Sequence, residues 1–219
     1  MPYEEIIPVV RRLAREYDIR GNRDRLRSFM DAVFDEVSRM YGLCRSFQRR
    51  AVVFGVTFEA VFAVVVQELF PDIKLLRECE IREACLMEDG RADFVVVDQD
   101  YTVRAIIEAK GSADYIVCDG RREEVRRPGL TRTDTVKKAV ANAAQVKYGI
   151  SMDMPYIIVT SHKPLPGTNS DCILKISMHG KLIDMVVDVT NIDDLNVFAD
   201  YVRKVRPSTK VKCSRFSRP

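Results

Sequence analysis

Two apolar segments that each contain charged side chains, residues 90–97 and 102–112, most constrain what this chain can fold into. Both are rich in β-branched residues, and the Asp-Gln-Asp sequence between them is typical of a turn, so the pattern predicts a β-hairpin. A hairpin loop with an even number of residues places Asp93 on the same face as Glu108. The two-residue period of a strand adds Lys110 to that face. We therefore expect two carboxylates and an amine to meet there.

These three side chains suit metal-assisted chemistry on phosphate. Carboxylate oxygens are preferred ligands of hard cations, and a metal can polarise a phosphate and generate hydroxide near neutral pH. Asp93 and Glu108 are thus candidate ligands for Mg²⁺, for which Mn²⁺ can substitute, and Lys110 would lie beside the attacking water. The alternative is a salt-bridge ladder on an exposed sheet face. Because the surrounding residues look buried and buried charges are seldom tolerated without a partner, we favour the functional interpretation.

The hairpin resembles the PD-(D/E)XK nucleases, and among them it is most similar to a type II restriction endonuclease. Asp93 matches the family's metal-binding aspartate, and Glu108-Ala109-Lys110 matches its (D/E)XK half. The amino-acid sequence of the two strands is also similar to that of the nuclease domain of type I restriction motor subunits. One departure is Ala92, which stands where the family motif has proline. The resemblance extends from about residue 50 to residue 188 and implies an α/β fold, a central mixed β-sheet flanked by helices.

A long apolar segment, residues 50–69, should form a helix buried against this sheet. We expect it to be too short and too interrupted to cross a membrane. The interruption is Glu59, whose carboxylate in an apolar helix needs either a basic partner or a metal nearby. In the family that the hairpin resembles, the helix before the sheet often supplies a glutamate, which implies an auxiliary catalytic role for Glu59.

The chain divides into three parts on this interpretation. Apolar spacing predicts amino-terminal helices over residues 3–17 and 24–41, with Gly42 ending the second. Their apolar side chains offer a surface for a homodimer. The predicted parts are an N-terminal helical extension, the nuclease core and a basic C-terminal tail, at residues 1–49, 50–205 and 206–219.

The rest of the core is predicted from period and turn signals. Thr133 is expected to cap the helix that follows it. The predicted elements are a strand over residues 74–87, a helix over 134–148, strands over 155–160 and 182–189, and a helix over 192–205.

Contacts with DNA must come from local clusters, because a formal charge of +3 is only mildly basic. The polar segment 112–133 leaves the catalytic strand directly, and we favour a DNA-contacting loop over solvated disorder. The candidate DNA-binding residues are Arg121, Arg122, Arg126, Arg127 and Arg132, together with Lys138 on the next helix. Gln145 on that helix is an auxiliary candidate. Some relatives place a glutamine and a tyrosine four residues apart here, whereas Tyr148 follows Gln145 by three.

The six cysteines form no Cys-x-x-Cys pair, and two histidines leave little for a zinc site. We expect reduced, mostly packed thiols. The first residues have neither a basic region nor a following apolar core, so no secretory signal is predicted and the protein is expected to be cytoplasmic, without membrane contact.

Together these patterns predict a Mg²⁺-dependent DNA endonuclease of the restriction type that hydrolyses phosphodiester bonds in double-stranded DNA. Two alternatives remain. A structure-specific nuclease, such as a junction resolvase or a virus-borne repair nuclease, would use the same residues. A non-catalytic DNA-binding module would retain the fold alone.

Overall fold

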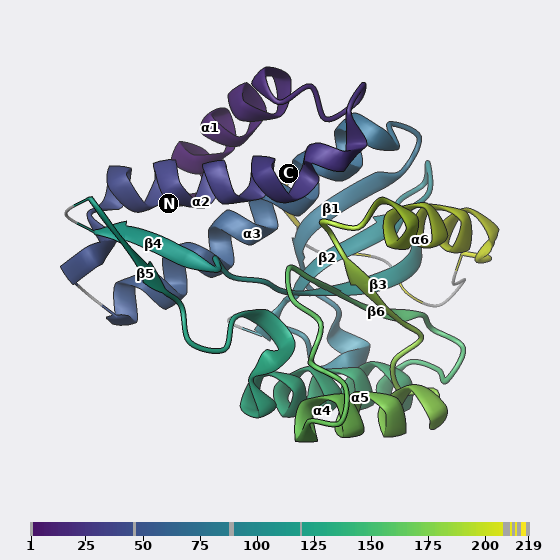
Figure 1. Cartoon of the computed structure of the whole chain (residues 1–219). Helices are drawn as coiled ribbons and strands as arrows, with labels where there is room; N and C mark the ends of the chain where they lie inside the picture. Colours follow the sequence, from purple (N-terminus) through teal and green to yellow (C-terminus); the bar gives the residue numbers. More distant parts are fainter. Residues whose placement is uncertain are drawn as a thin grey trace.

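The computed structural model describes residues 2–45, 47–87, 90–118 and 120–207, with Val211, Cys213, Phe216 and Ser217. Most of the predicted basic tail lies outside these residues. A central sheet lies between two layers of helices (Figure 1). The predicted α/β class, a mixed sheet flanked by helices, is confirmed.

The sheet has five strands in the order β1-β2-β3-β6-β7. The first three form an antiparallel meander, and β6 and β7 add in parallel to β3. Parallel neighbours need a crossover connection, here through helices, so the sheet is mixed. The strands are β1 (Lys74–Cys79), β2 (Ala92–Val97), β3 (Val103–Lys110), β6 (Tyr156–Thr160) and β7 (Met185–Asp188).

The hairpin of β2 and β3 has the predicted face parity. Phe94 pairs with Ile107 and Val95 with Ile106, which brings Asp93 opposite Glu108. A register shift occurs only beyond Val96, away from these carboxylates. The charged residues of the two strands therefore share one face.

Helices cover both faces of the sheet, and Figure 1 shows α1 to α3 on one side and α4 and α5 on the other. One hydrophobic core joins the first group and α6 to the sheet, and a second core lies under α4 and α5. The helices are α1 (Pro2–Glu16), α2 (Leu26–Tyr41), α3 (Phe47–Leu69), α4 (Thr133–Gly149), α5 (Asn169–His179) and α6 (Ile192–Lys204).

The amino-terminal helices are integrated with the rest of the chain. Gly42, with a φ of 58°, ends α2 as predicted. Apolar residues of α1 and α2 share the core of α3 and the sheet. The boundary predicted at residue 49 therefore does not separate two hydrophobic cores. The apolar side chains of α1 and α2, on which the dimer prediction depended, are buried within the chain.

Helix α3 is longer than expected. It has 23 residues, and residues 48–69 are long and apolar enough to cross a membrane by length and composition alone. The prediction that this segment is too short was wrong. Most of it is buried inside the protein, which accounts for its apolar sequence, as in the core helix of a soluble protein.

Two segments differ from the sequence prediction. The strand expected over residues 74–87 ends at Cys79, after Glu78 takes a positive φ of 53°, and a short 3-10 helix follows at Arg82–Ala84. The segment 112–133 is not a structureless loop: β4 (Tyr115–Cys118) and β5 (Arg121–Glu124) form a separate two-stranded sheet. It packs against α2, so this polar stretch is ordered.

The start of α4 and the presence of α5 also differ from the sequence prediction. Thr133 is the first residue of α4 instead of its cap, and its hydroxyl oxygen lies 3.2 Å from that of Ser170 on α5. Helix α5 was not expected. It begins after Thr168, whose hydroxyl oxygen accepts a hydrogen bond from the Asp171 N–H.

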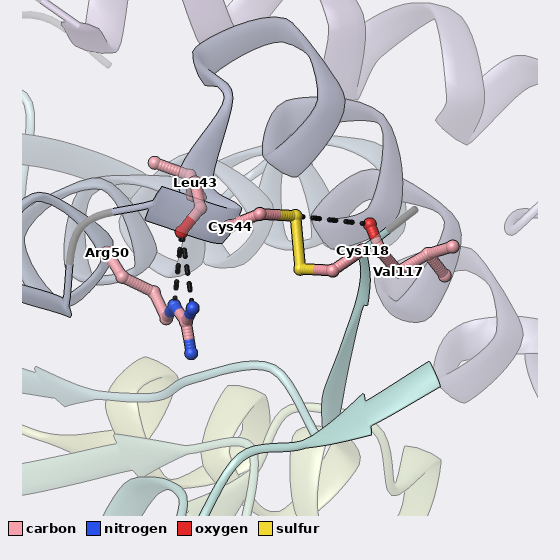
Figure 2. Close-up of a disulfide and its surroundings, with 5 residues drawn as sticks. All are labelled: Leu43, Cys44, Arg50, Val117 and Cys118. Atoms are coloured by element: carbon pink, nitrogen blue, oxygen red, sulfur yellow. Dashed lines mark hydrogen bonds between the residues drawn. A yellow bond between two sulfur atoms is a disulfide. The ribbon is translucent and has the colours of Figure 1, made fainter. Parts of the chain in front are cut away.

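Four cysteines form disulfides, contrary to the expectation of reduced thiols. Cys44 pairs with Cys118, and Cys79 pairs with Cys213. Figure 2 shows the first bond joining the 3-10 turn before α3 to the end of β4. Disulfides are typical of oxidising compartments and of intracellular proteins from hyperthermophiles, so the cytoplasmic assignment stays a prediction.

Candidate active site

A cleft of about 870 Å³ lies at the ends of β2 and β3 where the charged residues meet. Asp93 and Lys110 line it from the strands, and Glu59 lines it from α3. Its remaining walls are the amino-terminal half of α3, residues 124–129 and the start of α4. The cleft therefore collects elements from both helical layers around the strand ends.

Asp93, Glu108 and Lys110 converge as predicted. The Lys110 Nζ lies 2.5 Å from Glu108 Oε1 and 3.6 Å from Asp93 Oδ2. The backbone N–H of Ala109 donates a hydrogen bond of 2.7 Å to Asp93 Oδ2. The Glu108 side chain is only 7% exposed, whereas Asp93 and Lys110 are about a quarter exposed, at 23% and 25%. This arrangement differs from an exposed salt-bridge ladder because the carboxylates are largely removed from water.

Burial makes it unfavourable for Asp93 and Glu108 to carry negative charges at the same time. It raises the pKa of Asp93 from 3.8 to about 7, and the nearby Glu108 carboxylate adds to this effect against the opposing influence of Lys110. Burial also disfavours the charged form of Lys110, but Asp93 and Glu108 outweigh it and raise the pKa of the amine. One ammonium thus does not fully balance the two carboxylates. A further cation in this position would be favoured.

The donor set suits a hard divalent cation held by few protein ligands. Among the described residues, no group of three or more His, Cys, Asp or Glu side chains is placed to hold a metal ion. Asp93 and Glu108 would therefore supply two carboxylates, and solvent or substrate the rest. Mg²⁺ fits this pattern because it commonly retains several waters and binds through one or two carboxylates plus substrate phosphates.

Two residues that sequence reasoning missed hold Glu108 in place. The Tyr156 hydroxyl on β6 donates to Glu108 Oε2 at 3.0 Å, and the Asn142 amide on α4 donates to Oε1 at 3.1 Å. Burial, and then Glu108, raise the pKa of Tyr156 well above its usual value, so this phenol stays a donor. Gln145, the predicted auxiliary residue on α4, is exposed and is absent from the cleft lining. Asn142 contacts the Glu108 carboxylate instead.

Glu59 has a basic partner and also lies at the cleft. It lines the cleft, and its Oε2 accepts a hydrogen bond of 3.2 Å from the buried Arg77 on β1. Burial raises the pKa of Glu59, and the Arg77 guanidinium opposes this. Arg77 also lies 2.8 Å from Glu78 and over the ring of Tyr3. The glutamate is therefore a partnered group at the edge of the site.

The end of β3 is fixed by its neighbours. The Thr160 hydroxyl donates to the Lys110 carbonyl at 2.7 Å, and the Ser161 hydroxyl oxygen accepts from the Ser112 N–H at 2.9 Å. Gly111 has no room for a side chain, since a Cβ there would lie 2.1 Å from the Phe58 ring. The backbone that presents Lys110 is thereby held against both β6 and α3.

The predicted DNA-binding residues fall into two groups. Arg126, Arg127 and Arg132 line the cleft, and so does Arg50, which was not predicted. The others are exposed outside the lining; they are Arg121, Arg122 and Lys138.

Comparison with known proteins identifies no relative: no family model, no curated protein and no solved structure matches the chain. The assignment of roles to Asp93, Glu108 and Lys110 therefore depends on the residues and on their geometry alone.

Proposed function

We propose that the protein is a Mg²⁺-dependent DNA endonuclease with a restriction-endonuclease-like fold that hydrolyses phosphodiester bonds. The observation that carries this proposal is the convergence of two carboxylates, Asp93 on β2 and Glu108 on β3, with Lys110 on β3, at a cleft that Asp93 and Lys110 line. Arginines around the same cleft suit a polyanionic substrate.

Asp93 and Glu108 would hold the metal, and Mg²⁺ bound there would polarise a phosphate oxygen and lower the pKa of a water molecule. The Lys110 ammonium, in reach of both carboxylates, would stabilise the charge that develops on the nucleophile and the phosphate. Tyr156 and Asn142 would keep Glu108 oriented toward the cleft. Glu59, held by Arg77, would add negative charge beside the metal.

The observed burial favours this function over a purely structural role. A salt-bridge ladder on a sheet surface would leave its charges in water, where each pair contributes about 0–1 kcal/mol. Here Glu108 is buried and receives hydrogen bonds from three side chains. Such hydrogen bonds would hold the Glu108 carboxylate in one orientation, which suits a metal ligand.

Plasmid digestion tests the proposal. The protein should nick or cut DNA with Mg²⁺ or Mn²⁺, and excess chelator should stop the reaction. Lys110→Ala should abolish cleavage, while Lys175→Ala, an exposed lysine on α5, should not. Cleavage that persists in chelator would contradict the proposal. Plasmid and single-stranded circular DNA that both stay intact with Mg²⁺ and with Mn²⁺ would also contradict it, and the non-catalytic DNA-binding alternative would gain.

The restriction-type prediction requires two copies to cut both strands of a duplex, most simply as a two-fold homodimer. Light scattering in the presence of DNA measures this directly. A structure-specific nuclease acting on unpaired DNA has no such requirement.

A further inference from the structure

A short strap, residues 125–130, passes beside the candidate active site from one helical layer to the other. Val125 packs against the core under α3, whereas Leu130 is buried in the core under α4. Between them, Arg126, Arg127 and Gly129 line the cleft. In Figure 1 the strap is part of the teal chain that leads from β5 down to α4. The cleft is therefore bounded by α3, by α4 and by the strap.

Both ends of the strap are fixed. The Val125 N–H donates a hydrogen bond of 2.8 Å to the Asp114 carbonyl, and the Leu130 N–H donates one of 3.1 Å to the His162 carbonyl. Gly129 has a φ of 56° and packs so closely that a Cβ would lie 2.9 Å from Thr160 Oγ1. The strap is thus tied to the end of β6.

The hairpin before the strap is also held. The Cys44–Cys118 disulfide joins β4 to the turn that precedes α3, and Arg50 on α3 donates to the Leu43 carbonyl at 3.3 Å (Figure 2). Since β4 pairs with β5, this bond restrains the strand from which the strap departs. The strap is consequently a wall of the cleft, anchored on both sides.

The volume that this wall leaves is small for duplex DNA. A base-pair step about 3.4 Å thick and about 20 Å across fills on the order of 1,000 Å³, and one nucleotide takes up roughly half of that or less. The cleft measures about 870 Å³. The cleft is open to solvent on one side, so this volume limits only what enters between α3, α4 and the strap: about two nucleotides of one strand fit there, and the full width of a duplex does not.

The strap supplies charge suited to a phosphate backbone. Arg126 and Arg127 are exposed, and neither forms an ion pair with any residue that the structure describes. Arg50 lines the cleft from α3. Guanidinium groups on two walls can follow the phosphates of one strand toward the carboxylates at the centre.

We propose that the cleft accepts an unpaired strand of DNA and that intact duplex is a poor substrate. This inference rests on the proposed nuclease function and names its substrate class. Single strands, bubbles or branched junctions would present such a segment, whereas a linear duplex would need to open first.

Three DNAs of the same sequence test the inference: a single strand of about 40 nucleotides, its blunt duplex, and a duplex with a central bubble. With Mg²⁺, the single strand and the bubble should be cut at least about tenfold faster than the duplex, and the bubble should be cut within its unpaired part. Equal or faster cutting of the duplex would overturn the inference while leaving the nuclease function intact.

The affinity for each DNA, measured with Ca²⁺ in place of Mg²⁺, tests the inference without depending on cleavage. Fluorescence anisotropy should show tighter binding of the single strand than of the duplex; the reverse order, or equal affinity, would overturn the inference even for a protein that cuts nothing. A protein that prefers single strands but cuts none of the three DNAs would contradict the proposed function instead.

Two double arginine variants test whether the strap contacts the single strand. Arg126→Ala with Arg127→Ala should weaken single-strand binding at least about fivefold, because both side chains line the cleft. Arg23→Ala with Arg25→Ala removes two exposed arginines from the 3-10 turn before α2, outside the lining, and should change binding less than about twofold. Equal losses in the two double variants would refute a role for the strap.

Discussion

Replacing a candidate metal ligand should stabilise this protein when no metal is bound. Burial and the Glu108 carboxylate raise the pKa of Asp93 from 3.8 to about 7, so the ionised form is less favourable in the folded state than in the unfolded chain. Asp93→Asn removes that charge. Its side-chain oxygen can still accept the hydrogen bond from the Ala109 N–H. A loss of function and a gain in stability are therefore expected from one substitution.

The magnitude follows from the same pKa. At 1.36 kcal/mol for each pKa unit, a rise from 3.8 to about 7 corresponds to about 4 kcal/mol above neutral pH. Lys110 loses one of its two carboxylate partners, which reduces the gain. We expect Asp93→Asn to raise the free energy of unfolding by about 1–3 kcal/mol at pH 8. The melting temperature should rise by roughly 2–4 °C for each kcal/mol in a chain of this size.

The gain in stability from Asp93→Asn depends on pH. Because the folded-state pKa of this acid is raised, the wild-type protein has no destabilisation from Asp93 below the unfolded-state pKa of 3.8. It loses stability as the pH rises from there through about 7. The advantage of Asp93→Asn should be absent near pH 4 and complete above neutral pH.

Urea unfolding followed by far-ultraviolet circular dichroism, with chelator, at acid and alkaline pH measures these values. Asp184→Asn is the matched control: Asp184 lies 2.7 Å from the buried Lys147 ammonium, so its replacement should destabilise the protein. Mg²⁺ should then stabilise the wild type but not Asp93→Asn. A destabilised Asp93→Asn in chelator at pH 8 would refute the reasoning and support a structural ion-pair network.

Three further predictions concern single groups. Lys110→Ala should lower the cleavage rate at least about a hundredfold while the variant still shifts DNA in Ca²⁺, and Lys110→Arg should not restore cleavage; an unaltered rate would remove Lys110 from the site. Tyr156→Phe should weaken Mg²⁺ binding about tenfold or more, measured by Mn²⁺ competition, because Glu108 loses a donor; unchanged metal affinity would exclude a positioning role. Cys44→Ser should reduce the free energy of unfolding by about 2–4 kcal/mol without reductant, and with reductant the variant and the wild type should unfold alike; an equal stability without reductant would contradict the bond.

The parts of the site that the sequence predicted are those set by local geometry. The convergence of Asp93, Glu108 and Lys110 follows from strand parity across one hairpin, which does not depend on the rest of the fold. The end of α2 at Gly42 is equally local, since a glycine takes the left-handed conformation readily.

The parts that were missed depend on contacts between distant segments. Tyr156 reaches Glu108 because β6 pairs in parallel with β3, and no short-range pattern specifies that pairing. The disulfides join cysteines 74 and 134 residues apart, at spacings that carry no signal. Lys147 on α4 is buried, and its ammonium is paired with Asp184, a residue that follows α5 in the chain.

The parallel pairing of β3 with β6 determines when the candidate site can be completed during folding. The antiparallel meander of β1, β2 and β3 involves near neighbours in the chain and can form first. Until β6 arrives, with Tyr156 beside Ile106, the edge of β3 stays open and Glu108 lacks its tyrosine donor. A nascent chain that stops before residue 156 would therefore expose an apolar strand edge and have an incomplete site. The candidate site is therefore completed late in synthesis, with the carboxy-terminal part of the sheet.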